Sequence, residues 1–182
     1  MRRIFSSLLF SLYTYSAFAS YVISDGQIKA VQLGAQSQYD AINYSLSASV
    51  AGNALTIALK TQAGTDPTSR DVSKISFRSS TLTSGAFNQR SITSALSITI
   101  PSGTTIGTVN ASATNIYVYA MDNAGTVVLA VSLSPFSDKT VQSSSAISGG
   151  SSASTLYSTA AQSNLPIRCL GKILISEATA GT

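Results

Sequence analysis

The chain has no histidine and a single cysteine, Cys169, among its 182 residues. One cysteine cannot form a disulfide within the chain, and without histidine only carboxylates and carbonyl oxygens remain as ligands for a hard cation. The sequence therefore predicts no zinc, haem or iron–sulfur centre, and we expect no cofactor. A histidine acid or base is also excluded, so acid–base chemistry would fall on the carboxylates.

Charged residues are scarce as well. They make up 10% of the chain, and the formal net charge is +4. Arg2 and Arg3 supply two of these charges, which leaves about +2 (4 − 2) for the rest, and no other Lys/Arg cluster follows. Nucleic-acid binding requires a basic patch, so we expect no nucleic-acid partner. In place of charges, 34 Ser and 19 Thr predict a polar, nearly uncharged surface.

Residues 1–19 follow the pattern of a secretory signal peptide: two arginines, an apolar run over 4–15, and Ala17-Phe18-Ala19. Two interpretations remain open. The segment is either a signal peptide cleaved after Ala19, which would make Ser20 the mature N-terminus, or an assembly arm that packs on a partner. A membrane span needs about 20 apolar residues, and this run is too short and too rich in Ser and Thr.

The sequence predicts two hairpins. Apolar and polar residues alternate over 43–50 and again over 55–60, with a turn at 51–53 between them, which predicts an antiparallel pair with Leu46, Ala48, Val50, Ile57 and Leu59 on the core face. The runs 116–121 and 126–131 flank a turn that contains glycine and are apolar on both faces. We expect this second hairpin to be covered on each side.

Further strands are predicted over 74–78, where Ile75 and Phe77 face inward, and over 96–100. A final strand, 166–176, is predicted to carry Ile167, Cys169, Ile173 and Ile175 on one face. The Ser/Gly-rich stretch 134–154 is typical of a surface loop.

The prediction for residues 20–182 is thus a single all-β domain of about seven to nine strands. With little helical periodicity, it should be an antiparallel β-sandwich of jelly-roll or immunoglobulin-like type.

The sequence contains few candidate reactive groups. Asp66 and Asp71 share one loop and are the only candidate carboxylate pair, but Asp before Pro is a usual turn residue. No serine lies in a recognisable nucleophile motif. Cys169 alternates with core positions and is interpreted as a small buried hydrophobe. The eight tyrosines could form a contact surface, although Tyr44, Tyr117 and Tyr119 lie in predicted strands, which favours half-buried sheet positions. We therefore expect no catalytic, cofactor-binding or metal site, and a protein that is not an enzyme.

A resemblance covers residues 26–182. It is carried by Asn43-Tyr-Ser-Leu46, Leu55-Thr-Ile-Ala-Leu-Lys60, Gly64-Thr-Asp-Pro67, Phe77-Arg-Ser79, Ile116-Tyr-Val-Tyr-Ala120, Asn123-Ala-Gly-Thr126, Thr155-Leu-Tyr-Ser158, Pro166-Ile-Arg168 and Ala178-Thr-Ala-Gly-Thr182. This succession resembles a β-rich module that recurs in structural and tail-fibre-like proteins of tailed bacteriophages and their prophages. No functional residue is carried over with it.

The resemblance implies a non-enzymatic virion subunit of tail-fibre, head-fibre or capsid-decoration type. Its partners would be further copies of itself in a homo-oligomer, other virion proteins and, for host attachment, a glycan or protein of the host surface. Virions assemble in the cytoplasm, so a cleaved signal peptide would contradict this localisation. The alternative is a secreted or cell-surface bacterial protein that uses the same domain for binding or adhesion.

Overall fold

The computed structural model describes residues 41–79, 87–138 and 140–181, which all belong to a compact unit over Gln38–Thr182. The predicted signal or arm segment, 1–19, lies outside the described residues. Among those residues all regular structure is β, and no helix that could cross a membrane occurs. The strands are β1 (Ala41–Ile42), β2 (Ser45–Ala51), β3 (Ala54–Lys60), β4 (Ser73–Arg78), β5 (Phe87–Ile92), β6 (Leu96–Ile100), β7 (Ala113–Asn123), β8 (Thr126–Ser132), β9 (Val141–Ala146), β10 (Tyr157–Ser158) and β11 (Gln162–Ser176).

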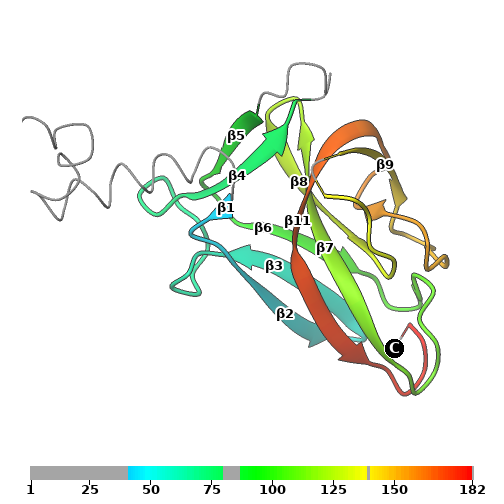
Figure 1. Ribbon diagram of the computed structural model, residues 1–182. Coiled ribbons are helices and arrows are strands. Elements are labelled where there is room, and N and C mark those ends of the chain that lie inside the picture. Colours follow the sequence, from blue (N-terminus) through cyan, green and yellow to red (C-terminus); the bar gives the residue numbers. More distant parts are fainter. Residues whose placement is uncertain (1–40, 80–86, 139, 182) are drawn as a thin grey trace, which may run out of the picture. The chain divides into compact units, whose positions relative to one another are not determined.

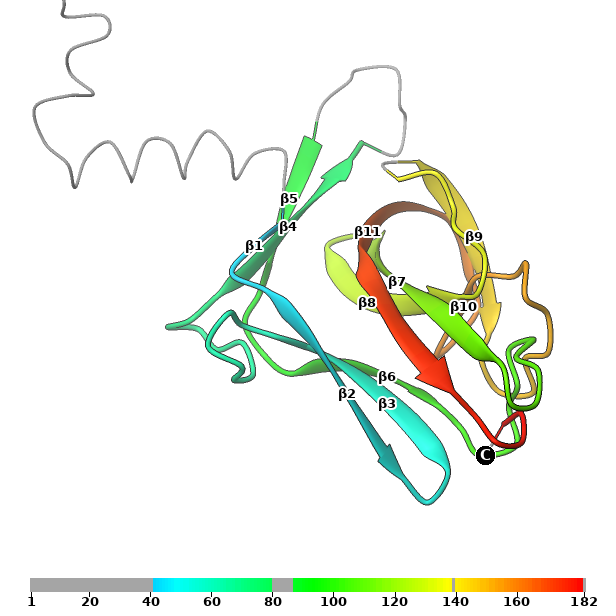
Figure 2. The same ribbon diagram turned by 60° about the horizontal axis from the view of Figure 1, so that its bottom comes forward.

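These strands form three sheets (Figure 1). Strands β10, β8, β7, β11 and β9 close into a barrel, while β1-β4-β5 and β2-β3-β6 are three-stranded sheets. Figure 2 shows the ring of the barrel with the two smaller sheets beside it. Every pairing is antiparallel except that of β9 with β10. The all-β, largely antiparallel prediction is confirmed, whereas a two-sheet sandwich is not, because one sheet closes on itself.

Both predicted hairpins are present. Strands β2 and β3 are joined by Gly52-Asn53, with φ of 54° and 60°, which is the pair of positive φ values that a type I′ turn requires. Ile57 and Leu59 are fully buried as predicted. The prediction for β2 was wrong in part, since Ala48 and Val50 are exposed. Strand β2 is at the edge of its sheet, and its core face is covered only near Leu46.

The β7–β8 hairpin turns at Ala124-Gly125 and is buried on both faces, as predicted. Ile116, Val118 and Ala120 join a large core cluster with residues of the two smaller sheets, among them Ile57, Ile75, Phe77 and Ile98. Tyr119, Met121 and Ala130 point the other way and form a second cluster with Leu156 and Ile167. Since the smaller sheets lie outside the ring, this second cluster fills the inside of the barrel.

The prediction that Ile167, Cys169, Ile173 and Ile175 share one face was wrong. The register between β11 and β7 shifts at Leu170, because Cys169 lies opposite Tyr119 while Gly171 lies opposite Val118. One extra residue forms a β-bulge, and with a period of two it reverses every side chain that follows. Ile167 and Cys169 therefore face the barrel interior, while Ile173 and Ile175 pack against the large outer cluster.

The stretch 134–154 is not one loop, contrary to the prediction. It contains β9, whose serines pair antiparallel with β11 and parallel with β10 and so close the barrel. Ser144 and Ser158, both buried, join their hydroxyls by a hydrogen bond between β9 and β10. A polar sequence can form this wall because its side-chain hydroxyls find partners on the neighbouring strand.

Candidate functional site

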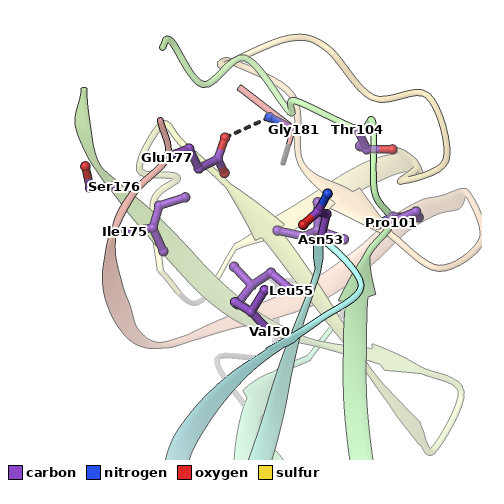
Figure 3. A pocket seen from close by; sticks show the side chains of 10 residues that line it. Val50, Asn53, Leu55, Pro101, Thr104, Ile175, Ser176, Glu177 and Gly181 are labelled. Carbon is purple, nitrogen blue, oxygen red and sulfur yellow. Dashed lines mark hydrogen bonds between the residues drawn. The ribbon is translucent and has the colours of Figure 1, made fainter. Parts of the chain in front are cut away.

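The described residues form an apolar hollow at the end of the β2–β3–β6 sheet, where the last residues of β11 pass over it (Figure 3). Its volume is about 340 Å³. Val50, Leu55, Ile100, Pro101 and Ile175 supply the apolar lining, and the remaining lining residues are Asn53, Thr104, Ser176, Glu177 and Gly181. The hollow exists because the edge strand β2 leaves the core face of its sheet uncovered at this end.

Among the described residues that line this hollow, Glu177 provides the only carboxylate, and it is held in place by its neighbours. Its Oε2 accepts hydrogen bonds from Thr108 Oγ1 at 2.9 Å and from the Gly181 N–H at 2.8 Å, the latter drawn in Figure 3. Its backbone carbonyl accepts from the Ala111 N–H at 2.7 Å. The carboxylate therefore ties the chain after β11 to the loop between β6 and β7.

The loop between β6 and β7 also holds residues 180 and 181, which follow Glu177, through two further hydrogen bonds. Asn110 Oδ1 accepts from the Ala180 N–H at 2.8 Å, and the Gly103 N–H donates to the Gly181 carbonyl at 2.8 Å. The hollow thus has a fixed rim and an apolar floor, with one carboxylate whose described partners are structural. This arrangement can enclose a small apolar group. Among the described residues no group of three potential metal ligands occurs.

Asp66 and Asp71, the candidate carboxylate pair, have different partners. Asp66 forms an ion pair with Lys60 at 2.7 Å, which closes the loop onto the end of β3. Asp71 accepts a hydrogen bond from Asn43 Nδ2 at 2.7 Å, which connects the start of β4 to the start of β2. Each carboxylate fixes a different part of the loop.

The other two described aspartates also hold elements together. Asp122 on β7 accepts two hydrogen bonds from Arg90 on β5, at 2.9 and 2.8 Å, and a third from the Gly125 N–H in its own hairpin turn. The Asp122 carboxylate raises the pKa of the Arg90 guanidinium, mainly through the side-chain hydrogen bonding between these two residues. Asp138 accepts from the Cys169 N–H at 2.7 Å and lies 3.7 Å from Arg168 Nε.

Cys169 is half-buried against the cluster inside the barrel. Burial raises the pKa of its thiol, and the negative charge of Asp138 adds to the effect. A thiol becomes a nucleophile only as thiolate, so this environment disfavours reaction at neutral pH. The position agrees with the interpretation of Cys169 as a packing residue.

Three described tyrosines use their hydroxyls to hold backbone: Tyr44, which precedes β2 and is not in a strand as predicted, Tyr119 on β7 and Tyr157 on β10. Tyr44 donates to the Leu170 carbonyl at the bulge, and the Phe136 N–H donates to Tyr119 Oη at 2.7 Å. Tyr157, which is buried, accepts from the N–H groups of Ser151 and Ser152. Tyr119 is also fully inside the barrel, at 1% exposure, rather than half-buried as predicted. Tyr13, Tyr15, Tyr21 and Tyr39 lie outside the described residues.

Reasoning from the sequence did not find the hollow or the role of Glu177. The residues involved come from β2, β3, β6 and β11, so the hollow is created by long-range pairing. The only local signal was the turn chemistry of Pro101-Ser-Gly103, which had indicated merely the end of a strand.

Comparisons with known proteins identify no family: no family model matches the chain, and no significant match is found to a curated protein or to a solved structure.

Proposed function

We propose that this protein is a non-enzymatic structural subunit of a phage-like particle, of tail-fibre, head-fibre or decoration type, with a role in host attachment where the particle presents it outside. The proposal starts from the succession of framework motifs that resembles the phage module. Its partners are further copies of itself, other virion proteins and a host-surface glycan or protein.

The observation that supports the non-enzymatic part of this proposal is the structural role of the acidic side chains. Asp66, Asp71, Asp122, Asp138 and Glu177 each accept a hydrogen bond that fixes a loop or joins two strands. Catalytic carboxylates need a reacting atom within reach and a pKa adjusted to the chemistry. Carboxylates that fix loops and join strands through hydrogen bonds are what a rigid scaffold requires.

The experiment asks whether the protein is part of a particle. Prophages in the source bacterium are induced, particles are purified on a density gradient, and the protein is quantified by mass spectrometry against the major capsid protein. We expect a fixed copy number per particle that survives a high-salt wash. The proposal fails if the protein is absent from particles.

A secreted binding protein is the second candidate, and the apolar hollow is the observation that favours it. A preformed concavity of about 340 Å³ is within the size range of small-ligand sites, which begins near 300 Å³. In that case the protein would be recovered from the culture medium with Ser20 as its first residue. Sequencing the N-terminus of the natural protein separates the two candidates.

A further inference from the structure

Strand β2 offers an open edge for another strand. It lies at one end of the β2-β3-β6 order, and no described strand pairs with its outer side. Figures 1 and 2 both show it at the border of its sheet with no ribbon beyond it. Residues 47–51 are exposed, and Val50 keeps 70% of its surface in contact with solvent.

The edge also lacks the features that usually prevent strands from pairing between molecules. Protected edges carry lysine or other charges, proline, a bulge, or are very short. Strand β2 reads Ser-Leu-Ser-Ala-Ser-Val-Ala over seven residues, has no charge and no proline, and pairs with β3 without a register shift. The edge strand β5, in contrast, includes Arg90.

The two-residue turn determines which peptide groups face outward. A β-turn over 51–54 joins its first carbonyl to its last N–H, so Ala51 and Ala54 form a hydrogen-bonded pair. Hydrogen-bonded and non-hydrogen-bonded pairs alternate along an antiparallel ladder. Leu46, Ala48 and Val50 therefore direct their N–H and C=O groups away from β3, toward the open side.

The sequence of β2 is nearly symmetric about Ala48. Ser47 and Ser49 flank it, Leu46 and Val50 come next, and small residues stand at both ends. A two-fold interface requires a surface that is complementary to itself. We propose that β2 pairs antiparallel with β2 of a second copy, with Ala48 opposite Ala48 of the other chain.

This register satisfies both the backbone and the side chains. The outward peptide groups of residues 46, 48 and 50 meet those of 50, 48 and 46 in the other copy, so all of them gain partners. Leu46 lies opposite Val50 of the second chain on the core face, which covers the exposed valine. The two three-stranded sheets then become one sheet of six strands that runs through both copies.

The contact is small, because one strand edge buries less than the roughly 1,000 Å² of a stable interface. Pairing in solution should therefore depend on concentration, and it should strengthen where a particle holds copies close together. The inference specifies a contact for the homo-oligomer of the proposed function, but the sequence and register of β2 support it independently.

Charge placed at the symmetry centre tests the pairing. In the full chain, Ala48→Lys and Ala48→Glu each put like charges opposite one another, and each should weaken self-association about fivefold in sedimentation velocity runs. An equimolar mixture of the two variants should associate again, because lysine then meets glutamate. Thr93→Lys, an exposed position away from β2, is the matched control and should behave as the wild type.

Cysteine cross-linking tests the register. In a Cys169→Ser background, Ala48→Cys should form a disulfide-linked dimer under mild oxidation, because opposed Cα atoms in a hydrogen-bonded pair lie about 5.5 Å apart. Ala51→Cys should not, since the two copies of residue 51 would be separated by six residues, or about 20 Å. Equal cross-linking at both positions would overturn the register.

Three further outcomes bear on the β2 pairing and on the proposed particle role. A wild-type chain that stays monomeric at high concentration overturns the proposed pairing. A chain that forms oligomers unaffected by Ala48→Lys overturns it too, while leaving the proposed particle role intact. Loss of the particle role with β2 pairing preserved would instead place the dimer in another function.

Discussion

At the scale of single residues, position rather than chemical type decides what a side chain contributes. Ile57 and Val50 are both β-branched, and both lie on the core face of the β2–β3 hairpin. Ile57 is fully buried in the large cluster, whereas Val50 is 70% exposed because the edge strand is uncovered there. The alternation of apolar residues places both on one face of the sheet, but it does not indicate how much of that face other elements cover.

Truncation of these two residues should give very different losses. Ile57→Ala removes buried carbon atoms and leaves a cavity, which should lower the free energy of unfolding by about 2 to 5 kcal/mol. Val50→Ala should cost less than about 0.5 kcal/mol, as is usual at the surface. Urea denaturation followed by circular dichroism measures both. Comparable losses would show that the core face is assigned incorrectly.

Cys169 should be a slow nucleophile. Burial and Asp138 raise the pKa of its thiol, so at pH 7.5 a smaller fraction is thiolate than in a free cysteine peptide. Alkylation by iodoacetamide should be slower than that of the peptide, and its rate should rise with pH through a pKa above the ordinary value near 8.5. Alkylation as fast as that of the peptide would contradict this environment. Urea-unfolded protein is the control and should react at the rate of the peptide.

At the scale of elements, the bulge in β11 allows one strand to serve two cores. Before Leu170 the strand contributes Ile167 to the barrel interior, and after Gly171 it contributes Ile173 and Ile175 to the large cluster. Gly171 has φ of 149°, a conformation that residues with a side chain rarely adopt. The change of face thus depends on a glycine at this position.

Gly171→Ala should therefore destabilise the protein through the backbone. The added Cβ would lie at an ordinary contact distance, 3.5 Å from Leu46 Cδ1, so crowding is not the cause. Strain at this φ should lower the free energy of unfolding by about 1 to 3 kcal/mol. Lys172→Ala, at an exposed position of the same strand, is the control and should change it by less than about 0.5 kcal/mol. Equal stability of both variants would mean that the bulge tolerates other conformations.

At the scale of the whole molecule, local patterns predicted the hairpins and long-range pairing determined the rest. The β2–β3 and β7–β8 hairpins follow from alternation and turn residues that lie next to each other in the sequence. The face change in β11 was missed because Ile167, Cys169, Ile173 and Ile175 alternate as if on one face, although Gly171 inside the strand is a signal of a bulge. Closure of the barrel depends on serine-rich β9, whose sequence is equally typical of a loop. The hollow near Glu177 arises only when β2, β6 and β11 meet.

The two cores should unfold together, because they lie on opposite faces of the same strands. Val118 and Tyr119 are neighbours on β7, yet the first belongs to the large cluster and the second to the barrel interior. Loss of β7 from either cluster would expose the other, so a single cooperative transition is expected for residues 41–181. Tyrosine fluorescence, which reports Tyr119 and Tyr157 inside the fold, should give the same midpoint as circular dichroism.

Variants in each core make this testable. Ile57→Ala in the large cluster and Met121→Ala inside the barrel should each shift both signals by the same amount, with losses of about 2 to 5 kcal/mol. If Met121→Ala gave the two signals different midpoints, unfolding would not be a single transition, and the shared strands would not couple the two cores. Strands β7 and β11 contribute residues to both clusters, so they are the elements through which the two cores would be coupled.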